Sequence, residues 1–319
     1  MTTRRGFIRT GGLATGAALG GALGTTAPVA TQAGQATPSA RLRTILAGSV
    51  PARCVNCGDV ATARLAEMHG FEMVMTGGSA LSLSKYGIGD YGMITTDDLV
   101  DFCRRTADRV GLPIIADADD GGGNPLNVYR TFQRMEKAGA ACVMIEDLYS
   151  AKHLSGFDEG KIISSEAMVD KVRAAVDARQ DDDTVLLVRS DLVADGGPLD
   201  EAIERVAAYA EAGGDVIFIP GIPLDQCRRA VEAAGRPILT GAPSVQAARN
   251  NGVGILFVGA MGGIATGAMD RAMAEFIETG AVGSAGGSNL AGARRLELIG
   301  NAETVERARR YNVQREGGQ

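Results

Sequence analysis

The chain has no tryptophan, only two histidines (His69 and His153) and only five cysteines among its 319 residues. Because zinc sites draw most of their ligands from histidine and cysteine, this scarcity argues against a zinc protein. Five cysteines in a chain of this length do not form a disulfide framework. Cys54 and Cys57 nevertheless have Cys-x-x-Cys spacing, so a single disulfide between them is possible.

Basic residues and long apolar runs are also scarce. The net charge of −6 argues against a nucleic-acid partner, and beyond residue 43 the only dense basic stretch is Arg307–Arg310. The mildly apolar stretch Gly11–Gly24 is too short and too rich in glycine to span a membrane, so we expect no span in the mature chain.

The N-terminal residues resemble a twin-arginine export signal. Thr3–Arg9 reads TRRGFIR and is followed by the Gly/Ala/Leu stretch and then by small residues and proline. We therefore expect residues 1–40 to be a signal and linker, and the mature protein to be periplasmic or extracellular. The alternative is a disordered basic tail on a cytoplasmic protein.

From residue 45 onward, short apolar runs alternate with amphipathic helical patterns. Eight such units over roughly 230 residues predict an α/β protein with a (β/α)8 TIM barrel at residues 41–285, followed by a C-terminal helical segment at 286–319. An open doubly wound sheet is the alternative, but no GxGxxG motif follows the first strand. The expected strands are Ala52–Asn56, Met73–Thr76, Ile114–Asp117, Cys142–Glu146, Val185–Arg189, Val216–Ile219, Ile238–Thr240 and Ile255–Val258.

Two of these expected strands end on acidic side chains. Asp117 and Asp119 would share one face if their strand continued, since alternate residues point the same way, and Glu146 ends the neighbouring strand. In a barrel of this type, chemistry takes place where the strands end. Three carboxylates without histidine or cysteine favour Mg²⁺ or Mn²⁺ over zinc, so we predict a metal site here.

Groups that bind anions end two other strands. Thr76, Gly77 and Gly78 offer bare backbone N–H groups for a carboxylate or oxyanion, or form an ordinary glycine-rich turn. Arg189 has the fork geometry for a carboxylate, or forms a structural ion pair with Asp191. Metal, N–H groups and arginine together predict a site for a small 2-oxo acid or dicarboxylate.

Residues from about Arg53 to Gly280 resemble the isocitrate lyase and phosphoenolpyruvate mutase superfamily. The resemblance implies a barrel assembled as a homotetramer, with the last helix swapped between subunits. It also implies Mg²⁺ near the three acids, substrate contacts at Gly77, Gly78 and Arg189, and Asp90 on a second loop near the site. The matching stretches are Asp59–Gly70, Thr76–Gly78, Gly89–Gly92, Pro113–Gly123, Asn127-Val128, Ala138–Asp147, Lys152, Met168–Ala178 and Arg189–Asp191.

One loop departs from the pattern of that superfamily. Where the lyase branch carries an acidic cysteine, this chain has Leu154, which cannot transfer a proton. The proton-transferring candidates in the loop are Lys152, His153 and Ser155, with Tyr86 and Tyr91 on another loop as alternatives.

We therefore predict a Mg²⁺-dependent lyase that acts on a small 2-oxo or 2-hydroxy carboxylate. It would cleave or decarboxylate its substrate through a metal-stabilised enolate. A phosphonopyruvate-type mutase or hydrolase that breaks a P–C bond is one alternative. A non-catalytic family member is the other, since Leu154 and Pro220-Gly221 depart from the lyase pattern.

Overall fold

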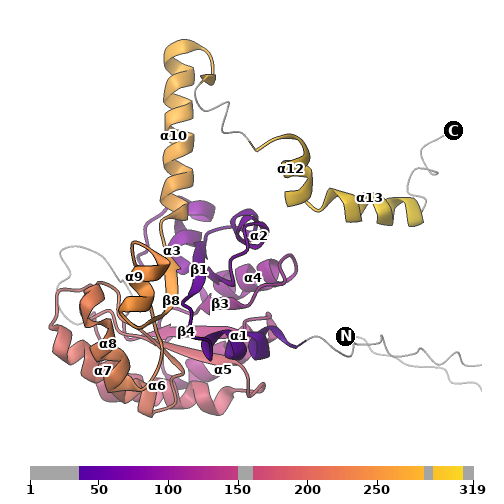
Figure 1. Cartoon of the computed structure of the whole chain (residues 1–319). Coiled ribbons are helices and arrows are strands. Elements are labelled where there is room, and N and C mark those ends of the chain that lie inside the picture. The colour runs from indigo at the N-terminus through magenta and orange to yellow at the C-terminus, as the bar shows by residue number, and fades with distance from the viewer. Residues whose placement is uncertain (1–35, 150–160, 284–289, 312–319) are drawn as a thin grey trace, which may run out of the picture. The chain divides into compact units, whose positions relative to one another are not determined.

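A computed structural model describes residues 36–149, 161–283 and 290–311. Its eight strands are all parallel, pair in sequence order and close by pairing β8 with β1 (Figure 1). The predicted (β/α)8 barrel is confirmed. The strands are β1 (Ala52–Cys57), β2 (Met73–Thr76), β3 (Ile114–Asp117), β4 (Cys142–Glu146), β5 (Val185–Arg189), β6 (Val216–Phe218), β7 (Ile238–Thr240) and β8 (Val253–Val258).

Helices follow the strands, and several of them begin at polar capping residues. Thr95 and Asp98 form a capping box at the start of α4, and Asn124 and Asn127 form another at α5. The elements after β1 to β8 are α2 (Val60–Met68), α3 (Gly78–Leu81) with the π-helix η1 (Ser82–Tyr86), α4 (Thr96–Ala107), α5 (Pro125–Lys137), α6 (Ser165–Ala178), α7 (Leu199–Glu211), η2 (Leu224–Gln226) with α8 (Cys227–Ala234), α9 (Val245–Asn250) and α10 (Met261–Thr279).

Two apolar layers hold the barrel. One fills the barrel interior with side chains such as Met73, Ile115 and Met144, and the other lies between the strands and the helices. Alternate residues of each strand contribute to alternate layers, as in other packed barrels. Cys54 lies in the inner layer and Cys57 in the outer layer. Both are free thiols, so the possible disulfide between them is not formed.

A helix before the first strand closes the N-terminal end of the barrel. In α1 (Pro38–Leu46), Leu42 is 1% exposed and belongs to the inner layer. Arg43 donates to the Thr184 carbonyl, directly before β5, and pairs with Asp215, directly before β6. The helix straddles the expected domain boundary at residues 40 and 41, so the chain before the first strand takes part in the core.

The C-terminal segment is helical but interrupted. Within the segment expected to be helical at 286–319, α12 (Gly292–Leu298) and α13 (Asn301–Arg310) are separated at Gly300, whose φ of 66° lies in the left-handed region. No helix within the described residues combines the length and the hydropathy that a membrane span needs. The export signal falls on residues 1–35, outside the described residues, and stays a prediction.

Candidate functional site

The strand ends place three charged residues in one layer at the C-terminal mouth of the barrel. Asp117, Glu146 and Arg189 each come two residues after an inward-facing side chain, namely Ile115, Met144 and Leu187. Because side chains alternate along a strand, all three continue the inner face of the barrel. The parallel register sets Glu146 directly opposite Arg189.

The chain after β3 stays hydrogen-bonded to β4, which brings a further acid to the site. The Ala118 N–H donates to the Met144 carbonyl at 3.0 Å, and the Glu146 N–H donates to the Asp119 carbonyl at 3.0 Å. Asp119 has a φ of 50°, so the strand does not continue to this residue as expected. A left-handed backbone is costly for a residue with a Cβ and is tolerated where surrounding bonds fix it.

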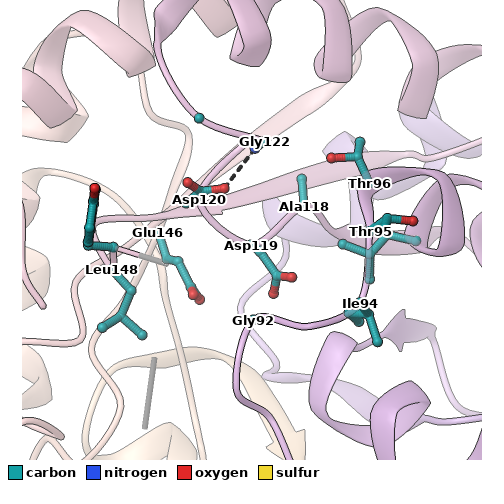
Figure 2. Close-up of a pocket in the computed structure, with 13 residues that line it drawn as sticks. Gly92, Ile94, Thr95, Thr96, Ala118, Asp119, Asp120, Gly122, Glu146 and Leu148 are labelled. Atoms are coloured by element: carbon teal, nitrogen blue, oxygen red, sulfur yellow. Dashed lines mark hydrogen bonds between the residues drawn. The ribbon is translucent and has the colours of Figure 1, made fainter. Parts of the chain in front are cut away.

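Asp117, Asp119 and Glu146 form the predicted cluster. One carboxylate oxygen of each lies within 4.8 Å of the others, and Figure 2 shows the Asp119 and Glu146 carboxylates facing the same space. Asp117 and Glu146 are only 5% and 1% exposed. Buried carboxylates this close repel one another unless a cation lies between them, and an all-oxygen donor set fits Mg²⁺ or Mn²⁺.

Gly78, the second glycine after β2, lies directly against these acids. The Gly78 N–H donates to Asp117 Oδ2 at 2.8 Å, and a Cβ on Gly78 would come within 3.0 Å of Asp119 Oδ1. The N–H predicted to hold a substrate carboxylate thus orients a carboxylate of the cluster. Thr76 is buried at the end of β2, and Asp90 lies half-buried in the loop between η1 and α4.

Arg189 is held by two acids. Its Nη1 lies 3.1 Å from Glu146 Oε2 and its Nη2 lies 2.6 Å from Asp191 Oδ1, while the guanidinium stands 5.3 Å from the Phe218 ring centroid. Burial alone would lower the pKa of Arg189, but the two carboxylates raise it, so the side chain stays cationic. Burial also raises the pKa of Asp191 to about 7, against the opposing effect of Arg189.

Two buried residues that were absent from the predicted site support it. Asp147 is fully buried and accepts hydrogen bonds from Ser190 Oγ (2.7 Å), the Asp191 N–H (2.9 Å) and the Tyr209 hydroxyl (2.9 Å). The sequence could have indicated this residue, because Asp147 directly follows Glu146 at the end of an expected strand. Lys171 of α6 donates from Nζ to the Asp120 carbonyl at 2.8 Å, and helical periodicity alone does not reveal that contact.

A pocket of about 460 Å³ opens beside the acid cluster (Figure 2). Asp119 and Glu146 line it, and Ile94, Thr95 and Thr96 line the part contributed by the start of α4. Arg189, Gly77 and Gly78 are not part of its lining. The pocket therefore gives access to the acids from the side of α4.

The predicted proton-transfer residues are only partly described. Lys152, His153 and Ser155 lie in residues 150–160, outside the described residues. Of the alternatives, Tyr86 donates its hydroxyl hydrogen bond to Asp98, and Tyr91 is 38% exposed. The hydroxyl of Tyr86 is thus hydrogen-bonded to the first turn of α4.

The chain is a (β/α)8 barrel with clustered carboxylates and a buried arginine at the ends of its strands, which is the face where enzymes of this fold carry their active sites. The family described as phosphoenolpyruvate phosphomutase matches residues 42–277. The chain belongs to this family, and the resemblance read from its motifs is confirmed.

Curated relatives match nearly two thirds of the chain. The 2-methylisocitrate lyase of Shewanella oneidensis is 37% identical over 200 residues, which are 62% of this chain and 68% of the relative. The oxaloacetate decarboxylase of Rhodopseudomonas palustris strain HaA2 is 39% identical over 208 residues, which are 65% of this chain and 71% of the relative.

Solved structures agree with the fold. Oxaloacetate acetylhydrolase in complex with 3,3-difluorooxalacetate is 28% identical, with a TM-score of 0.78 over 86% of this chain and 97% of that chain. Phosphonopyruvate hydrolase in complex with oxalate and Mg²⁺ is 26% identical, with a TM-score of 0.76 over 86% of this chain and 99% of that chain.

Proposed function

We propose that this protein is a Mg²⁺-dependent lyase for a small 2-oxo dicarboxylate of the oxaloacetate type. Family membership and the lyase and decarboxylase relatives make it an enzyme of the carbon–carbon lyase class. The observation that carries the proposal is the cluster of Asp117, Asp119 and Glu146, with Arg189 paired to Glu146 at the same barrel mouth.

The three acids would hold the metal, with Mn²⁺ as the alternative ion. The bound ion would polarise the 2-oxo group and stabilise the negative charge that develops on it. The chain's own contribution is to keep the carboxylates in place: the Gly78 N–H fixes Asp117, and the hydrogen bond from the Glu146 N–H to the Asp119 carbonyl fixes Asp119. Arg189 supplies the permanent positive charge for a substrate carboxylate.

Decarboxylation of oxaloacetate makes modest demands on these residues. The bond between C3 and C4 breaks, C4 leaves as carbon dioxide, and the electron pair stays on pyruvate as its enolate. One proton then adds to C3. Water, Lys152, His153 or Ser155 can deliver that proton, so Leu154 in place of an acidic cysteine is compatible with this reaction. Cleavage of a methylisocitrate-type substrate places a heavier demand on that missing acid.

A comparison of three compounds tests the proposal. The purified protein is incubated with Mg²⁺ and oxaloacetate, 2-methylisocitrate or phosphonopyruvate, and carbon dioxide, succinate and phosphate are measured alongside pyruvate. We expect carbon dioxide from oxaloacetate, at a rate that EDTA and Asp117→Ala both reduce to the non-enzymatic background. Succinate from 2-methylisocitrate or phosphate from phosphonopyruvate would assign a different bond, and turnover of none would favour the non-catalytic alternative.

We also propose that the protein is a homo-oligomer, with the tetramer as the expected state. Helix α10 carries an exposed apolar stripe at helical spacing, in which Met273 is 67%, Phe276 53% and Ile277 85% exposed. Exposed apolar faces of this kind mark contact sites. Ile277→Lys should lower the molecular mass in analytical ultracentrifugation, whereas Ala274→Lys, off the stripe on the same helix, should not.

A further inference from the structure

One polar side chain at the barrel mouth has no role in the site described so far. Asn56 is the penultimate residue of β1 and follows Cys54 by two residues. Since Cys54 belongs to the inner layer of the barrel, Asn56 continues the same inward face. It therefore joins the layer that contains Asp117, Glu146 and Arg189.

The carboxamide oxygen of Asn56 is buried and has no hydrogen-bond partner among the described residues. The residue is 7% exposed, and within the described part of the chain no group hydrogen-bonds to its Oδ1 atom. A buried amide without a partner lowers the stability of the fold. A chain that places such a group at a binding site instead keeps it for a ligand.

The neighbouring strand leaves room for this amide. A Cβ on Gly77 would lie 2.1 Å from Asn56 Oδ1 and 2.9 Å from its Nδ2, so the amide occupies the space that a side chain at residue 77 would take. The next residue, Gly78, donates to Asp117. The amide thus lies one residue away from the backbone that orients the metal cluster.

We infer that Asn56 is a substrate-binding residue whose carboxamide hydrogen-bonds to an oxygen of the small acid held at the barrel mouth. This inference rests on the proposed function, because it needs an acid bound beside the metal. The amide can donate from Nδ2 to a carboxylate of the acid, and its Oδ1 can accept from the hydroxyl of a 2-hydroxy acid or of the enol form of a 2-oxo acid. A residue from β1 thereby completes a site whose other members come from β3, β4 and β5.

Asn56→Leu keeps the approximate shape and removes both polar groups. We expect it to weaken the binding of oxalate at saturating Mg²⁺ by about tenfold or more in calorimetry, as for loss of a hydrogen bond to a charged group. The midpoint of thermal unfolding should stay equal or rise, because the unsatisfied amide is gone. The matched control is Thr106→Val: Thr106 is also buried with an unpartnered hydroxyl in the described chain, but lies within α4. It should leave the affinity for oxalate unchanged.

Each outcome has a distinct meaning. If Asn56→Leu bound oxalate with an affinity within about twofold of that of the unaltered protein, the loss would be smaller than that expected for one hydrogen bond. That result would overturn the inference and leave the proposed function standing. Weaker binding of Mg²⁺ alone would assign the amide to the metal and also overturn it. If the unaltered protein bound no oxalate, the proposed function would fail and the role of Asn56 with it. If Asn56→Leu weakens oxalate binding, Asn56→Ser should bind oxalate more tightly than Asn56→Leu does, because serine restores one polar group.

Discussion

Arg189 and Glu146 face each other across β5 and β4, with 3.1 Å between Arg189 Nη1 and Glu146 Oε2. The same arginine also lies 2.6 Å from Asp191 Oδ1, so one guanidinium balances two buried acids. A cation bound at the acid cluster would compete with Arg189 for Glu146. We therefore expect metal binding to release one arm of the guanidinium toward a substrate carboxylate.

Replacing this arginine should damage stability as well as binding. Arg189→Met leaves Glu146 and Asp191 buried without their cation, and breaking a buried ion pair from one side costs about 3–5 kcal/mol. Urea unfolding in EDTA measures the loss. Arg189→Lys is the control, because it keeps the charge but not the two-armed geometry, and its loss should be smaller. Equal stability of both variants and the unaltered protein would contradict this account.

Asp119 should matter for the metal and little for the fold. Asp119→Asn removes one charge from the cluster, so the rise in melting temperature that Mg²⁺ gives the unaltered protein should largely disappear. Thermal unfolding with and without Mg²⁺ measures this difference. Asp120→Asn is the matched control in the same loop, where its side-chain oxygen can still accept from the Gly122 N–H. A similar Mg²⁺ response in both variants would remove Asp119 from the metal site.

Much of this site followed from the sequence for a physical reason. Strands buried on both faces of a parallel barrel are continuous apolar runs, so they stop visibly at the first charged residue. That is why the ends of β3, β4 and β5, at Asp117, Glu146 and Arg189, were predicted at their observed positions. The ends of the strands in turn fix which side chains share the barrel mouth.

Other features depend on contacts that a linear pattern does not contain. The φ of Asp119 follows from its hydrogen bond to the Glu146 N–H, and an extended continuation was the default expectation. An ordinary glycine-rich turn was the alternative interpretation of Thr76, Gly77 and Gly78, yet Gly78 begins a helix, Gly78–Leu81, that continues into η1. The orientation of Lys171 toward Asp120 depends on how α6 packs, which periodicity does not specify.

Stability should fall with rising pH through the range in which Asp191 titrates. Burial raises the pKa of Asp191 from 3.8 to about 7, so the folded state binds this proton more tightly than the unfolded state. The favourable contribution is complete below about pH 4 and is lost as the pH rises through about 7, a change of up to about 4 kcal/mol. Urea unfolding in EDTA at several pH values, compared with Asp191→Asn, measures it. Parallel pH profiles for the two proteins would show that Asp191 is not the group responsible.

Lys171 should act on the metal site through the loop that it holds. Its Nζ donates to the Asp120 carbonyl, one residue after Asp119, and the side chain is 8% exposed. Burial lowers the pKa of Lys171, while the charges of Asp120 and Glu146 oppose that effect. Lys171→Met retains the aliphatic chain and removes the donor, so Asp119 loses a constraint on its strained backbone.

We expect Lys171→Met to weaken Mg²⁺ binding by about tenfold, the lower end of the range for outer-shell partners of metal ligands. Calorimetric titration with Mg²⁺ measures the affinity, and assays at saturating Mg²⁺ should recover most of the turnover rate, because the ligands themselves are intact. Lys137→Met, at the C-terminal end of α5, controls for the loss of one positive charge and should bind Mg²⁺ normally. If Lys171→Met lost turnover that saturating Mg²⁺ did not restore, the lysine would act on the substrate instead of on the metal loop.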